Sequence, residues 1–188
     1  VGKKVEKIVD SLPQYIFKDE LEAIIRHAVA GEGVLEKKIR ADIKQRYKVF
    51  GKLYSKHRPT LVFICDWILK NRFANGFKVN DETDARWFLG YIREIFGEEH
   101  SRMTPRSLDA KVSALGVLCD RGKYIHPSAV TIDQSILDEV NQYIMDSPKN
   151  AISFMELFEA FKDRLAGTQI SNRYFLQGVM KLHRSYAD

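Results

Sequence analysis

The chain has 188 residues, a formal net charge of +5 and a pI near 9.1, with 45% hydrophobic and 29% charged residues. These values are typical of a globular protein, and the longest apolar run, Leu61–Cys65, is too short to cross a membrane. No signal peptide is evident, so the sequence predicts a cytoplasmic location. The two cysteines, Cys65 and Cys119, have no metal-like spacing, and we expect free thiols.

The N-terminal third of the chain predicts three helices, one short strand and one hairpin. Apolar residues recur at helical spacing, as at Leu21, Ile25 and Ala28. Pro13 and the segment Gly31-Glu32-Gly33 separate the helices. The expected helices are 3–12, 19–30 and 34–47, the expected strand is 15–17, and the expected hairpin is 47–59 with a turn at Gly51-Lys52.

The middle third repeats this order of elements. Thr104 is an N-cap followed by Pro105 at the first helical position, and Pro59 is expected in the first turn of another helix. The expected helices are 59–71, 81–96 and 104–115, the expected strand is 77–79, and the expected hairpin is 117–127 with a turn at Gly122-Lys123. The apolar side of the second of these helices is expected to comprise Trp87, Phe88, Tyr91, Ile92 and Ile95.

The C-terminal third predicts three helices and a minimal strand. The expected helices are 133–145, 154–165 with Ser153 as its cap, and 172–183 with Ser171 as its cap, and the expected strand is Ala151-Ile152. The aromatic residues of the second helix are expected in a core. The chain then ends where a third hairpin would begin.

The recurring order is helix, strand, helix, helix, strand, turn, strand. It resembles that of winged-helix proteins, in which a helix-turn-helix is followed by a hairpin called the wing. Bacterial transcription regulators and plasmid replication initiators carry such domains in tandem. We therefore predict a mainly α fold with small β-hairpin wings (α+β), in three tandem winged-helix repeats at 1–57, 58–127 and 128–188, the last without its wing.

The resemblance implies how such a protein would contact DNA. In that family the helix before the wing usually enters the major groove, while the wing touches phosphates or the minor groove. Other winged helices bind only protein, so the fold alone does not decide the function.

Positive charge is concentrated toward the N-terminus. The net charge is +5 over residues 1–57, +2 over 58–127 and −2 over 128–188. In the helix 34–47, Lys37, Arg40 and Lys44 are expected on a stripe away from the apolar side. In the first repeat, the residues expected to contact DNA are Lys37, Lys38, Arg40, Lys44, Lys48 and Lys52. The alternative is an ordinary solvated helix face.

DNA contacts are also expected in the other repeats. The residues concerned are Arg102, Arg106, Lys111, Arg121, Lys123 and Arg173. Arg106, near the start of the helix before the second hairpin, is the best candidate for a base contact because arginine binds guanine bidentately. Its alternative is an ion pair with Asp109. Asn172 and Gln177 are also of types that read bases, but the third repeat is net acidic, which favours protein contact or a scaffold role.

Catalysis has little support in the sequence. The five histidines are scattered over separate elements, and Gly31-Glu32-Gly33 lacks the Lys-Ser/Thr of a phosphate-binding loop. We therefore expect no enzyme, no cofactor and no metal.

The function predicted from the sequence is double-stranded DNA binding through the first two repeats, in transcription regulation or replication initiation. One alternative is a protein-interaction or scaffold module of a larger assembly, and another is a DNA-handling piece of a larger enzyme. The expected partners are double-stranded DNA and a protein partner or further domains of a longer chain, but no membrane.

Overall fold

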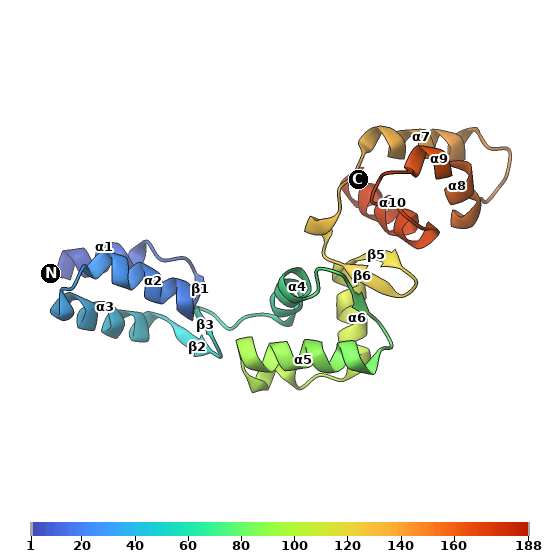
Figure 1. Cartoon of the computed structure of the whole chain (residues 1–188). Helices are drawn as coiled ribbons and strands as arrows, with labels where there is room; N and C mark the ends of the chain where they lie inside the picture. The colour runs from blue at the N-terminus through green and yellow to red at the C-terminus, as the bar shows by residue number, and fades with distance from the viewer. Residues whose placement is uncertain (1, 188) are drawn as a thin grey trace. The chain divides into compact units, whose positions relative to one another are not determined.

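The structure, a computed structural model, describes residues 2–187, with side chains as far as residue 184. Over this range ten helices account for 63% of the chain and accompany two small three-stranded antiparallel sheets, so the fold is mainly α and belongs to the α+β class (Figure 1). None of the described helices is long and apolar enough to cross a membrane. Two compact units make up the chain. The first comprises Val1–Ile64 and Leu89–Arg102, and the second Cys65–Phe88 and Met103–Asp188.

The first sheet follows the predicted order of elements. In chain order these are α1 (Gly2–Asp10), β1 (Tyr15–Phe17), α2 (Lys18–Val29), α3 (Gly33–Arg46), β2 (Lys48–Phe50) and β3 (Leu53–Ser55). β3 lies between the other two strands, so Tyr54 pairs with Ile16 on one side and with Val49 on the other. The predicted helices, strand and hairpin of this region are confirmed.

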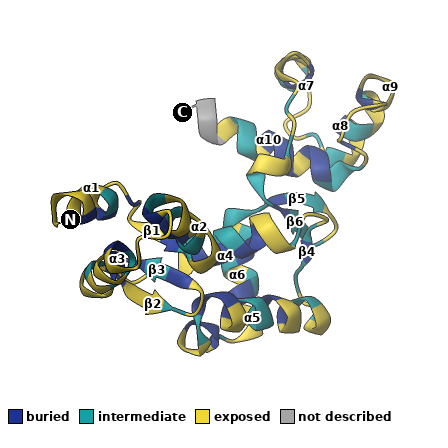
Figure 2. Cartoon of the chain, turned by 60° about the vertical axis from the view of Figure 1, so that its left-hand side comes forward, coloured by how far each residue is buried: buried dark blue, intermediate teal, exposed yellow. Residues whose placement is uncertain are grey.

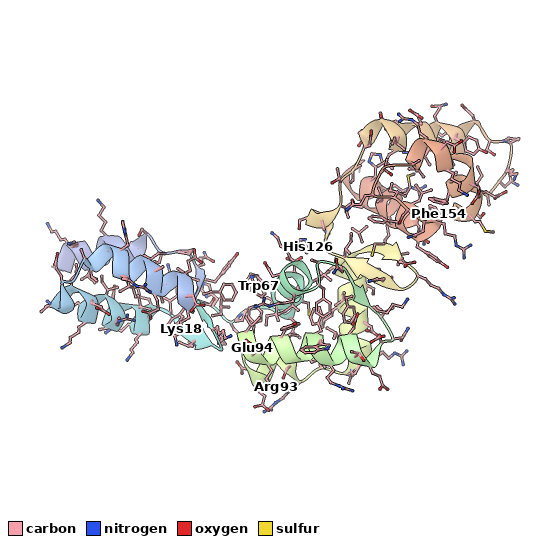
Figure 3. All side chains as sticks on the ribbon, viewed as in Figure 1. Lys18, Trp67, Arg93, Glu94, His126 and Phe154 are labelled. Carbon is pink, nitrogen blue, oxygen red and sulfur yellow. The ribbon has the colours of Figure 1, made fainter. Side chains whose placement is uncertain are left out.

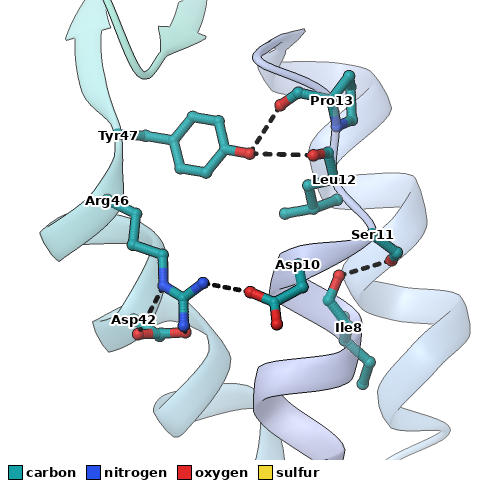
Figure 4. A network of polar contacts seen from close by, with 8 residues as sticks. All are labelled: Ile8, Asp10, Ser11, Leu12, Pro13, Asp42, Arg46 and Tyr47. Carbon is teal, nitrogen blue, oxygen red and sulfur yellow. Dashed lines mark hydrogen bonds and ion pairs between the residues drawn. The ribbon is translucent and has the colours of Figure 1, made fainter.

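Apolar residues of α1, α2 and α3 meet in one core. Its buried members are Val5, Val9, Leu12, Ile16, Leu21, Ile25, Val29, Leu35, Ile39, Ile43 and Tyr47. The Tyr47 hydroxyl is satisfied there because it donates to the carbonyl of Pro13, 2.7 Å away (Figure 4). At the edge of the core, Arg46 joins Asp42 of its own helix to Asp10 of α1 (Figure 4). α3 is therefore fixed against the segment that contains α1 by apolar packing, a hydroxyl bond and an ion pair.

The next helix, α4 (Leu61–Arg72), contributes residues to both compact units. It begins after Thr60, whose hydroxyl accepts a hydrogen bond from the amide of Phe63 at 3.1 Å. Pro59 therefore precedes the cap, and its expected place in the first turn was wrong. The physical reason is that Thr60 supplies the capping oxygen that ends the non-helical segment.

The helix α5 (Glu82–Phe96) buries a different stripe from the predicted one. Phe88, Ile92 and Ile95 are buried, whereas the side chain of Trp87 is 59% exposed. Its predicted place on the apolar side was wrong. Each residue turns the helix by about 100°, so a stripe that passes through Phe88 leaves Trp87 at its margin.

The second sheet has the same strand order as the first. It is formed by β4 (Phe77–Lys78), β5 (Val117–Asp120) and β6 (Lys123–Ile125), with β6 in the middle, and α6 (Pro105–Leu115) precedes the hairpin. Thr104 caps α6 by accepting from the amide of Ser107 at 3.1 Å, and Pro105 is the first helical residue, both as predicted. The predicted strand, helix and hairpin are confirmed here too.

The C-terminal segment is helical, with a three-residue turn before it. Its elements are η2 (Pro127–Ala129), α7 (Gln134–Asp146), α8 (Phe154–Ala160), α9 (Lys162–Leu165) and α10 (Arg173–Ala187). Ser153 caps α8 through a reciprocal capping box with Glu156, as predicted for Ser153. The cap predicted at Ser171 was wrong: Asn172 caps α10 by accepting from the amide of Phe175 at 2.9 Å.

No strand forms at Ala151-Ile152, which is in the described part of the chain, so that prediction was wrong. A strand of two residues is stable only when it pairs with a neighbour, and this segment has no hairpin following it with which to pair. The helix expected over 154–165 is also interrupted, at Phe161, between α8 and α9. The aromatic residues of this region do contribute to a core, as expected.

The last helix packs against the second hairpin, within the second compact unit. Figure 2 shows α10 beside β5 and β6. Val117 and Ile125 of the hairpin share one core with Leu176 and Val179 of α10. A Cβ atom at Gly178 would lie 2.1 Å from the carbonyl oxygen of Leu118, so the helix backbone touches the strand backbone. The boundary proposed at residue 127 stays a prediction, although this core includes residues from both sides of it.

We expect the substitution Gly178→Ala to lower the free energy of unfolding by about 1–3 kcal/mol, because a new methyl group must separate α10 from β5. Gly90→Ala is the matched control, since Gly90 is also helical and a Cβ there meets nothing within 4 Å. That control should raise stability by roughly 0.5–1 kcal/mol. Urea unfolding of the two variants checks this, and equal effects would contradict the close backbone contact.

Candidate nucleic-acid interface

The solvent-facing side of α3 is cationic. Six of the exposed residues of α3 form what we call the lysine face: Val34, Lys37, Lys38, Ala41, Lys44 and Gln45. Leu35, Ile39 and Ile43 are buried on the opposite side, as predicted, and their burial directs the lysine face outward. The three lysines have no carboxylate partner among the described side chains. Asp42 lies beside Lys38 and lines the same surface hollow, but its carboxylate is paired with Arg46, 3.1 Å away. The lysine face therefore presents three unpaired positive charges to solvent.

Arg40 is not part of the lysine face, although the sequence placed it there. Its guanidinium is half-buried and makes two parallel bonds, of 2.8 and 2.7 Å, to the carboxylate of Glu22 in α2. Its Nε donates to Glu36 at 2.9 Å. These bonds lower the pKa of Glu22 and raise that of Arg40, because each charge stabilises the other. The arginine is thus engaged within the protein.

The first hairpin is fixed at its tip to the end of α5, within the first compact unit. The amide of Lys52 donates to the carbonyl of Ile95 at 2.7 Å, and Lys52 Nζ lies 2.6 Å from Glu94. Glu94 of α5 is labelled in Figure 3. Gly51 has φ +59°, and a Cβ there would lie 2.6 Å from the same carbonyl. Lys52 therefore has an internal partner, whereas Lys48 is exposed on β2 without one among the described side chains.

Arg106 lies at the start of α6, as predicted, and is exposed. It lines a shallow hollow together with Asp81, Glu82 and Asp109. Asp109 Oδ2 accepts from the amide of Asn80 at 3.0 Å, and its Oδ1 is buried without a hydrogen-bond partner, so the alternative ion pair with Arg106 does not form. The acids around this arginine oppose the approach of a phosphate, which makes the site less favourable than the lysine face.

The other residues of the second compact unit that were predicted to contact DNA differ in how far their side chains are exposed to solvent. Arg121 is exposed at the hairpin tip, where its carbonyl accepts from Lys78. Lys123 is half-buried over Gly76, and Lys111 is half-buried on α6. Only Arg121 of these presents its charge fully to solvent.

The predicted base-reading residues at the start of α10 have internal partners. Arg173 lies over the Tyr174 ring, 4.9 Å from its centroid, and donates to Met155. Asn172 donates to the carbonyl of Cys119 at 2.9 Å, which ties α10 to the second hairpin.

Arg102 belongs to the first compact unit and is exposed. Both cysteines are free thiols, as expected, and Cys65 is buried.

Ser128, His126 and Asp66 come closest to a catalytic arrangement among the described residues. His126, labelled in Figure 3, has Nδ1 2.7 Å from Ser128 Oγ and Nε2 3.0 Å from Asp66. However, Nδ1 also accepts the Ser128 amide as the cap of η2, and the Ala129 amide is bonded to the His126 carbonyl rather than directed at a substrate. The trio is therefore explained as a helix cap. No group of His, Cys, Asp or Glu suited to a metal occurs in the described part of the chain.

Sequence reasoning missed His100, which lies in η1 (Glu98–Ser101) and is buried against the hairpin residue Phe50, with ring centroids 5.9 Å apart. Burial lowers the pKa of His100, while Glu99, 3.3 Å from its Nε2, acts in the opposite direction and Arg58 adds to the lowering. Phe50 and His100 are 50 positions apart in sequence, so no local pattern indicates this contact.

Comparison of the chain with protein-family models, with curated proteins and with solved structures found no match. What the protein binds must therefore be inferred from its own side chains. Among these, the lysine face combines exposure, a single sign of charge and a rigid support.

We expect stability to fall as the pH drops below about 6.5, because the unfolded chain then binds a proton that the buried His100 resists. The contribution of His100 to stability is fully present above that pH, because the pKa of His100 is lower in the folded protein than in the unfolded chain. Urea unfolding at about pH 8 and about pH 5 checks this against His100→Gln, which has no such proton. An equal pH dependence in both proteins would contradict it.

Proposed function

We propose that the protein binds double-stranded DNA, with the lysine face of α3 as its principal contact. The observation that carries the proposal is that Lys37, Lys38 and Lys44 are exposed together, while the acids of the same helix are held by arginines. Lysines on one side of a helix neutralise phosphates and release bound counterions, which is the main source of affinity for DNA.

The order of elements supports a winged-helix arrangement. Around each three-stranded sheet the chain order is helix, strand, helix, helix and hairpin. The helix directly before the hairpin is α3 for the first sheet and α6 for the second. By resemblance, α3 would lie in a major groove, with Lys48 of the first hairpin near the backbone. Arg106 and Arg121 would supply a second contact, and the function would be transcription regulation or replication initiation by a non-enzymatic protein. Three tandem repeats remain part of this proposal.

A second candidate is a scaffold or protein-interaction module. The observation that favours it is that both hairpins are used internally: Lys52 and Gly51 contact the end of α5, and Leu118 contacts α10. In this candidate, units whose hairpins are occupied internally would serve as rigid spacers within an assembly. The lysine face is unaffected by this packing, and for that reason DNA binding remains the preferred function.

We expect fluorescence anisotropy to detect binding of random duplex DNA at about 50 mM salt, weakening steeply toward about 200 mM. Changing Lys37, Lys38 and Lys44 to Glu should weaken binding and reduce the log–log salt slope by about three, because each lysine would no longer neutralise a phosphate.

The matched control changes Lys70, Lys181 and Arg184 to Glu, which alters the net charge equally in the second compact unit. It should retain most of the affinity. If the wild-type protein does not bind at low salt, the DNA proposal fails and the scaffold candidate replaces it. If both variants lose affinity equally, binding depends on overall charge and the role given to α3 fails.

A further inference from the structure

Arg40 is the centre of a three-residue cluster that joins α2 to α3. Two of its guanidinium nitrogens face both oxygens of Glu22 in a fork, and its third, Nε, faces Glu36 one turn earlier on the same helix. This planar geometry uses the guanidinium more completely than a lysine ammonium would be used. Each of the three guanidinium nitrogens therefore has a carboxylate partner, although the side chain is 41% exposed.

A phosphate contact by Arg40 would break this cluster. To reach DNA, the guanidinium would have to leave two carboxylates, and both would then remain uncompensated beside the lysine face. Like charges so placed repel the phosphate backbone. The bonds already made by Arg40 therefore oppose the role that its position in the sequence suggests.

We propose that Arg40 is a positioning residue for the DNA site: it holds α3 at a fixed angle to α2, compensates one of the two negative charges of Glu22 and Glu36, and does not contact phosphate. The inference rests on the proposed function. The lysines then act as the contacts, and the arginine determines how they are presented. Arg46 has the corresponding position toward α1, through Asp10 and Asp42.

The decisive comparison is between Arg40→Gln and the double variant Arg40→Gln with Glu22→Gln. The single change leaves two carboxylates unneutralised, so we expect DNA affinity to fall by at least about twofold, the lower end of coupling between contacting residues. The double variant has the same net charge as the wild type, and two Gln amides can still bond across the helices. We expect it to restore affinity to the wild-type value.

The salt slope gives an independent measurement. A positioning residue leaves the number of neutralised phosphates unchanged, so the log–log slope of the double variant should equal that of the wild type. A phosphate contact would instead lower the slope by about one in both variants, without rescue. The control is Arg164→Gln, which breaks a similar forked pair with Glu139 in the second compact unit and should leave DNA binding unchanged.

The outcomes separate the two proposals. Failure of the double variant to regain affinity, with a slope lower by about one, would overturn the positioning role while leaving DNA binding by α3 intact. An absence of effect in Arg40→Gln would also overturn it. Absence of binding by the wild-type protein would overturn the proposed function itself, and the positioning role with it.

Discussion

At two glycines the backbone of a hairpin touches the backbone of another segment. These two contacts attach each hairpin to the rest of its compact unit. At Gly51 the chain turns with a positive φ directly against the carbonyl of Ile95, and at Gly178 a helix lies on the backbone of Leu118. A side chain at either place would hold the elements apart. Because both glycines allow close approach, each hairpin is attached to a helix far along the chain. The hairpins are thereby parts of the packed structure more than independent wings.

This attachment divides the basic residues into two groups. In the hairpins, Lys52 is exposed but paired with Glu94, and Lys123 is half-buried over Gly76. The lysines of the lysine face are exposed and unpaired. Within α3, the arginines are bonded to acids and the lysines are not. The physical difference is that a planar guanidinium forms two bonds to one carboxylate, while a compact ammonium is strongly hydrated and favours water. The lysines are therefore the unpaired charges on the outer side of α3, where Asp42 is paired with Arg46.

Local chemistry explains why much of the fold is predictable from the sequence. Thr104 with Pro105, and Ser153 with Glu156, mark helix starts through bonds within a few residues, and the structure has them there. Hairpins at Gly51 and Gly122 follow from the need for a positive φ at the turn. The predictions that failed concerned the buried side of a helix or the residue that caps it, both of which depend on tertiary packing. Trp87 lies outside the buried stripe, and Asn172 rather than Ser171 caps α10 because its amide also reaches the second hairpin.

The sequence by itself determined the order of the elements, the apolar side of α3 and the surplus of Lys and Arg around it, since these depend on periodicity, caps and composition. Only the tertiary structure decided which of those charges are available. Whether the charge of Arg40 is paired depends on Glu22, eighteen positions earlier, and whether that of Lys52 is paired depends on Glu94. Coulomb attraction acts between groups that folding brings together, and sequence separation carries no information about that distance.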